Sequence, residues 1–163
     1  MTSRYHKILS VASKNAEKSD QTFQHGAVIT QGSKILEEGY NKGNRTKILD
    51  HVFTCAHAEM DVLNKFINGY LIPKYGRNFT KHTNKYSIWV VRLNKQNKSQ
   101  FTDSKPCHYC STLLKKYGFS KVYFTTNNNM LQVQKVCDLV SDHKSNCQLK
   151  SEQLDTSLKL RLF

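Results

Sequence analysis

The sequence predicts an α/β sandwich built around a mixed sheet. Three observations predict this class: a β-hairpin pattern near the start, an alternation of helical and strand-like segments after it, and a length of 163 residues, which suits one domain with a real core. Hydrophobic residues make up 38% of the chain and aromatic residues 10%, which favours a folded domain over a disordered chain.

The first elements are a helix and a hairpin. Two short apolar runs at 27–30 and 34–37 flank the letters "QGS", a pattern that predicts a β-hairpin with Gly32 in its turn. Before them, apolar residues at helical spacing predict an amphipathic helix over residues 4–18; these are Tyr5, Ile8, Leu9, Ala12 and Ala16.

The later segments alternate between the two periodicities. Pro106 and Gly118 bound one of them, as expected for the first turn and the end of a helix. In order, we expect a helix at 57–67, a strand at 85–93, a helix at 106–118, a strand at 121–126 and a helix at 130–140. Two basic segments, 66–86 and 94–104, lie between elements and are candidates for the rim of a site.

The charge favours an anionic partner. The formal net charge is +13 and only 12 residues are acidic, so nucleotides and nucleic acid are both candidate partners. No compact run of Lys and Arg with interleaved aromatic residues stands out. No apolar run is long enough for a membrane span, and the N-terminus lacks the apolar core of a signal peptide. We therefore expect a soluble, intracellular protein, cytoplasmic or nuclear, without a membrane partner.

The cysteine pattern favours chemistry over a disulfide framework. The count is odd and the spacing irregular, and in a reducing compartment a close pair is more often catalytic or metal-binding. The five residues are Cys55, Cys107, Cys110, Cys137 and Cys147.

The close pair has partners upstream. Cys107 and Cys110 stand three apart in "KPCHYC", and "TCAHAEM" supplies His57 and Glu59 at the start of another helix. One imidazole and two thiolates suit zinc, and three protein ligands leave the fourth position open, as in catalytic sites. Glu59 is then placed to carry a proton. A redox pair would not require the histidine and glutamate. A non-catalytic zinc module would need a fourth ligand, for which Cys55 or His108 are the nearby candidates.

These residues resemble the signature of the zinc nucleobase deaminases, H-x-E…P-C-x-x-C. His57-Ala58-Glu59 is followed by Pro106-Cys107-His108-Tyr109-Cys110, and "GAVITQGSKILEEGYN" and "GFSKVYFTT" look like the family's hairpin and a later strand. The resemblance covers residues 4–140. It implies a three-layer α/β/α sandwich with a mixed sheet of about five strands. We expect a deaminase domain at 1–140 and a C-terminal tail or helix packed on it at 141–163.

The resemblance also implies the activity and its parts. It implies hydrolytic deamination with one zinc ion held by His57, Cys107 and Cys110, and with Glu59 as the proton carrier. A CMP- or dCMP-like nucleotide or nucleoside is the expected substrate; cytosine or adenine in single-stranded DNA, RNA or tRNA is the alternative. A homo-oligomer is expected from the same resemblance. The candidate substrate-binding residues are Asn41, Lys42, Arg45, Ala58 and Ser104.

Overall fold

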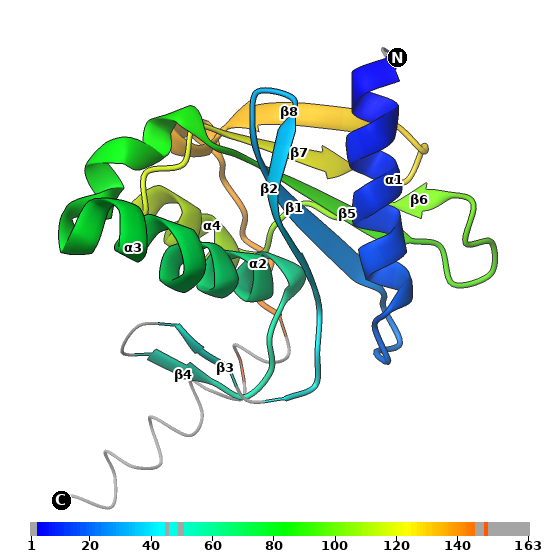
Figure 1. The fold of residues 1–163 in the computed structure, drawn as a ribbon. Coiled ribbons are helices and arrows are strands. Elements are labelled where there is room, and N and C mark those ends of the chain that lie inside the picture. Colours follow the sequence, from blue (N-terminus) through cyan, green and yellow to red (C-terminus); the bar gives the residue numbers. More distant parts are fainter. Residues whose placement is uncertain (1–2, 45, 49–50, 146–148, 150–163) are drawn as a thin grey trace, which may run out of the picture.

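The central element of the fold is a mixed β-sheet with helices on both sides (Figure 1). The computed structural model describes residues 3–44, 46–48, 51–145 and 149. The helices are α1 (Ser3–Glu17), α2 (Ala58–Phe66), α3 (Ile72–Tyr75) and α4 (His108–Lys116), with a π-helical turn at Ile67–Leu71 and 3₁₀ segments at Gly76–Lys85 and Val136–Asp138. The strands are β1 (His25–Gln31), β2 (Lys34–Tyr40), β3 (Thr46–Ile48), β4 (His51–Phe53), β5 (Ser87–Leu93), β6 (Phe101–Thr102), β7 (Lys121–Thr125) and β8 (Leu131–Lys135).

The strand order of the large sheet is β2-β1-β5-β7-β8, with β6 paired to β5. Strands β5 and β7 are parallel, and the other pairs in this sheet are antiparallel. A parallel pair needs a crossover, and α4 lies in the connection between β5 and β7. The expected mixed sheet is therefore confirmed.

Side chains of the central strands alternate between two cores. Ile88 and Val90 of β5 join the core under α2 and α4, whereas Trp89 and Val91 join the core under α1. Each central strand reads as a continuous apolar run because both of its faces are buried. The three-layer α/β/α sandwich expected from the sequence is confirmed.

Glycine allows α2 to lie directly on the sheet. A Cβ atom on Gly39 of β2 would lie 2.7 Å from the backbone nitrogen of Val62 and 2.9 Å from its Cβ. Distances below about 3 Å cannot be accommodated without moving the backbone of α2, so Gly39 fixes how closely the helix approaches β2. The start of α2 is thereby held in place.

The helix predicted at 130–140 is wrong. Asn129 has a positive φ of 57° and lies in a turn in which Thr126 N–H donates to Met130 O. The turn reverses the chain, and residues 131–135 pair with β7 as strand β8. A helix would have used Met130, Val133 and Val140 as an apolar face, but all three side chains are more than half exposed. Strands β3, β4 and β6 and helix α3 were also not predicted.

The C-terminal segment falls mostly outside the described residues. Of the predicted tail at 141–163, the structure describes 141–145 and 149. The backbone N–H of His108 donates to His143 O at 2.8 Å, so the first tail residues lie against the start of α4. Across the described ranges, no helix combines the length and apolarity that crossing a membrane requires.

Candidate active site

Two helix N-termini meet at the site. His57 is the N-cap residue of α2 and Cys107 is the N-cap residue of α4, and neither side chain caps its own helix. Both donor groups are therefore free for another partner. Cys110 lies in the first turn of α4 and Glu59 in the first turn of α2. The positive ends of two helix dipoles stabilise negative charge here.

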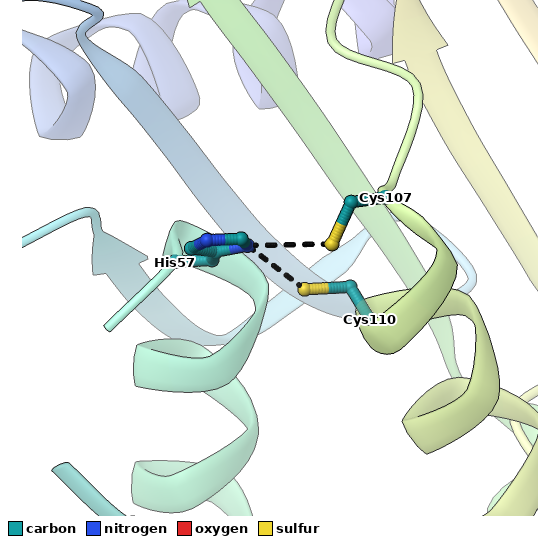
Figure 2. A group of neighbouring side chains, drawn as sticks. All are labelled: His57, Cys107 and Cys110. Carbon is teal, nitrogen blue, oxygen red and sulfur yellow. Dashed lines mark hydrogen bonds between the residues drawn. The ribbon is translucent and has the colours of Figure 1, made fainter. Parts of the chain in front are cut away.

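The three predicted ligands form one compact group (Figure 2). His57 Nδ1 lies 3.5 Å from Cys107 Sγ and 3.3 Å from Cys110 Sγ, and all three donor atoms lie within 4.8 Å of one another. In a tetrahedral zinc site, bonds of about 2.3 Å to sulfur and about 2.0 Å to nitrogen place the N and S ligands about 3.5 Å apart. The donor set and its spacing thus fit zinc.

The cysteine sulfurs share a negative charge. A hydrogen bond from Cys110, helped by His57, lowers the pKa of Cys107 to about 4 despite its burial. The same hydrogen bond, together with burial, raises the pKa of Cys110 well above its ordinary value. Burial disfavours the charged form of His57, but the hydrogen bond to Cys107 and the charge of Glu59 raise its pKa overall. A thiolate therefore exists at neutral pH, as metal binding requires.

Glu59 is a buried carboxyl group with a raised pKa. Its side chain is buried, with 5% of the residue exposed. Burial raises its pKa to about 7, although the positive charge of His57 opposes the shift. A carboxyl group with a pKa near the working pH can both accept and donate a proton.

Among the residues that the structure describes, no fourth His, Cys, Asp or Glu joins the group of three ligands. Cys55 is half-buried and engaged in a disulfide, so its sulfur is not offered as a ligand. His108 is exposed and its Nδ1 contacts Ser141 O at 3.1 Å. The closed site that a non-catalytic module would need is therefore not formed by either candidate.

Asn41 holds two segments of backbone together. Its Oδ1 accepts from the N–H of His25 at 2.8 Å, and its Nδ2 donates to Phe23 O at 2.7 Å. An amide side chain offers two donors and two acceptors, so one N–H and one lone pair remain for another partner.

Lys42 is paired within the protein. Its Nζ lies 3.0 Å from Asp61 Oδ1 and 4.5 Å from the centre of the Tyr40 ring. Its backbone exchanges two hydrogen bonds with Ala56, at 2.9 and 3.0 Å. Lys42 therefore lies beside the residues that lead into His57, with its charge already compensated by Asp61.

Ser104 and Ala58 have different environments. The Ser104 hydroxyl is buried, contacts Val90 O at 2.8 Å and Thr125 Oγ1 at 2.9 Å, and accepts from the N–H of Thr125 at 2.8 Å. Ala58 is the first residue of α2 and is fully buried, and an N–H at this position has no partner within the helix. Arg45 lies outside the described residues.

His25 is a site neighbour that the sequence analysis missed. Burial, with the positive charges of Arg92 and His57, lowers the pKa of His25 to about 4, and the charge of Cys107 also acts on it. The neutral ring donates from Nδ1 to Phe23 O at 3.1 Å, which leaves Nε2 as an acceptor. The hairpin register pairs Gly26 with Tyr40, so extending it would have placed residue 25 beside Asn41.

Comparisons with known proteins agree with this geometry. Residues 2–126 match the family described as the cytidine and deoxycytidylate deaminase zinc-binding region. A cytidine deaminase from Burkholderia pseudomallei is 22% identical, covers 88% of this chain and 100% of its own, and superposes with a TM-score of 0.57. No curated protein sequence matches the chain.

Two further solved structures are more distant. A dCMP deaminase from the cyanophage S-TIM5 is 19% identical over 78% of this chain and 86% of its own, with a TM-score of 0.49. A cytidine deaminase from Mycobacterium tuberculosis is 15% identical over 86% of this chain and 97% of its own, with a TM-score of 0.47. The family match spans well over half of the chain, and the ligand group fits the metal that this family binds. The chain therefore belongs to the cytidine and deoxycytidylate deaminase family, and it is a hydrolytic deaminase that depends on one zinc ion.

Proposed function

We propose that the protein converts the cytosine of a nucleotide or nucleoside to uracil, consuming one water and releasing one ammonia. The observation that carries the proposal is the placement of a buried carboxyl group, Glu59, within the electrostatic reach of His57, Cys107 and Cys110. The family description, which names cytidine and deoxycytidylate, supports the choice of base.

His57 Nδ1 and the sulfurs of Cys107 and Cys110 would hold the zinc ion. Zinc in such a site supplies a water nucleophile at neutral pH by lowering the pKa of water to about 7. The two helix N-termini stabilise the thiolates, and the hydrogen bonds among the three side chains orient them before the metal binds.

Glu59 would carry the proton through the reaction. With a pKa near 7, it accepts the proton of the attacking water and passes it to the ring nitrogen next to the amino-bearing carbon. In the second half of the reaction it takes the proton of the newly added hydroxyl group on that carbon and delivers it to the departing amine. Cytosine and water thereby become uracil and ammonia, and Glu59 returns to its starting state.

The substrate-binding residues divide into two groups in this proposal. Asn41 and the N–H of Ala58 would contact the substrate directly, because each retains hydrogen-bonding capacity. Ser104 would act by holding the loop that leads into Cys107, because its hydroxyl bonds are made to Val90 and Thr125. Lys42 would contact a substrate phosphate only after leaving Asp61.

Ammonia release from cytidine, CMP and dCMP tests the proposal, with product mass and zinc content measured on the same samples. We expect turnover on at least one of the three. Glu59→Gln should lower that turnover by about 1,000-fold while keeping one zinc per chain, because it removes the proton carrier and none of the ligands. Unchanged turnover in Glu59→Gln, or no turnover on any of the three compounds, would contradict the proposal.

A further inference from the structure

The C-terminal ends of α2 and α4 carry a surface that the reaction does not use. Residues 62–102 contain no aspartate or glutamate and eight lysines or arginines: Lys65, Lys74, Arg77, Lys81, Lys85, Arg92, Lys95 and Lys98. The middle of this stretch forms the π-helical turn, α3 and the 3₁₀ segment that follow α2. Five of these cations lie in the last turn of α2 and in the segment that follows it: Lys65, Lys74, Arg77, Lys81 and Lys85. The other three lie in β5 and in the loop after it.

The segment 66–86 does not line the rim of the active site. It continues from the C-terminal end of α2, whereas His57 lies at the other end of that helix (Figure 1). The nine residues of α2 separate the two by about 14 Å. The same segment also packs on the end of α4, where Phe79 lies 6.0 Å from the ring of Tyr117. Lys115 and Lys116 in the last turn of α4 add to the charge there.

The fold brings aromatic rings and cations together on this surface. The imidazole of His82 stacks on Tyr75 with a centroid distance of 4.3 Å and an interplanar angle of 15°. Lys74 and Lys85 lie 5.3 and 5.0 Å from the centre of the same tyrosine ring, and Lys85 Nζ lies 2.8 Å from its hydroxyl. His82 is exposed, so it is accessible to another ring.

The cations of this surface are not neutralised by acids. Within the described part of the chain, Lys74, Arg77, Lys81 and Lys85 form no ion pair with a carboxylate. All four residues are exposed. Lys65, by contrast, pairs with Asp61 at 2.9 Å. An uncompensated positive surface attracts a polyanion, and an exposed aromatic stack adds a preference for unpaired bases.

We propose that this surface, defined by Lys74, Tyr75, Arg77, Lys81, His82 and Lys85, binds single-stranded nucleic acid. The phosphates contact the four cations, and a base stacks on His82. Binding at this surface goes beyond the proposed deamination and does not require it. An exposed stack discriminates single strands from duplexes, because the bases of a duplex already stack on one another.

The test is fluorescence anisotropy with a labelled mixed-sequence oligonucleotide of about 16 nucleotides, a length that spans one single-strand binding site. The fourfold variant K74Q/R77Q/K81Q/K85Q removes the cations of the surface. A matched control, K7Q/K14Q/K34Q/K98Q, removes four exposed lysines that do not belong to the six residues of this surface. Each lowers the net charge of +13 by four, so the pair separates position from total charge.

We expect the surface variant to bind at least tenfold more weakly and to lower the slope of log affinity against log salt by about 3, since each phosphate contact on a single strand contributes about 0.7. The control should change the slope by less than about 1. His82→Ala should weaken binding to the single strand by about tenfold and leave binding to a duplex of the same sequence unchanged. Turnover of cytidine, CMP or dCMP should match the wild type in all three variants.

Three outcomes would overturn the proposal: equal losses in the surface and control variants, binding to the duplex as tight as to the single strand, or binding to phosphatidylserine vesicles without binding to the oligonucleotide. Oligonucleotide binding is also measured with the Glu59→Gln protein, which lacks the proposed proton carrier. A failure of the proposed deamination therefore leaves this test intact, and a failure here leaves monomer turnover as a separate result.

Discussion

At the N-terminal ends of α2 and α4, the functional groups are mostly buried, are held by one another and include the Cys107 thiolate, whereas the cations that follow the C-terminal end of α2 are exposed and, within the described residues, form no ion pair with a carboxylate. Glu59 and the Cys107 thiolate belong to the first region. Lys81 and Lys85 belong to the second. One pair of helices thus separates two opposite chemistries along its length.

The helix dipole accounts for only part of this difference. Anions are favoured at helix N-termini and cations at C-termini, which suits the cysteine sulfurs at one end and Lys115 and Lys116 at the other. The dipole effect fades within one turn, so it does not explain why residues 62–102 lack acids altogether. The chemistry of the first region comes from two short motifs, whereas the positive charge of the second comes from the composition of a long segment.

The largest expected effect comes from removing a ligand. Cys110→Ala should abolish stoichiometric zinc binding and lower turnover by at least about 1,000-fold, because two remaining donors do not hold a catalytic ion in place. Cys137→Ala is the matched control, since Cys137 is also a free thiol but is exposed and lies in the 3₁₀ segment after β8. Elemental analysis and ammonia release on both variants check the prediction. Full zinc content in Cys110→Ala would remove Cys110 from the ligand set.

Local periodicity correctly predicted the elements whose structure is determined by residues close together in the sequence. For the helix at 4–18 and the hairpin around Gly32, the majority of the predicted ends lie within one or two residues of the observed ends. The prediction of a helix at 130–140 was wrong because the apolar residues of this segment also fit helical spacing. Its strand forms through pairing with β7, a contact that no local pattern contains.

The residues of the site also divide into those that the sequence predicts and those whose contacts depend on the fold. His57, Cys107 and Cys110 were predicted from motif spacing, and the fold brings their donor atoms together because each motif begins a helix. The bond between Asn41 and the His25 backbone depends on hairpin register, and the pairing of Lys42 with Asp61 joins residues 19 positions apart. Such contacts are set by packing, which composition and spacing do not determine.

A smaller effect is expected on stability when one charged residue is replaced in each region. Asp61 accepts from the N–H of Tyr40 at 3.1 Å and pairs with Lys42 and Lys65 at 3.0 and 2.9 Å. Asp61→Asn replaces one acceptor by a donor that faces these groups, and it should lower the free energy of unfolding by about 2 kcal/mol. Lys81→Gln, in the acid-free surface, should change it by less than about 0.5 kcal/mol. Urea unfolding of both variants measures the contrast, and equal losses would show that the two regions are not electrostatically distinct.

The smallest expected effect is a shift in the titration of one tyrosine. The hydrogen bond from Lys85, with a further one from Tyr86, lowers the pKa of Tyr75 to about 8 because the nearby ammonium stabilises the phenolate. Ultraviolet absorbance titration should therefore show one tyrosine ionising about two units before an ordinary one, at about pH 10. Tyr75→Phe should remove that step and Lys85→Gln should move it up. Ionisation adds a negative charge to the surface, so oligonucleotide binding by the wild type should weaken as pH rises through 8, while binding by Tyr75→Phe should not. A wild-type titration without an early step would mean that Lys85 does not hold the Tyr75 hydroxyl in solution, and the cation would then be free to contact phosphate at any pH.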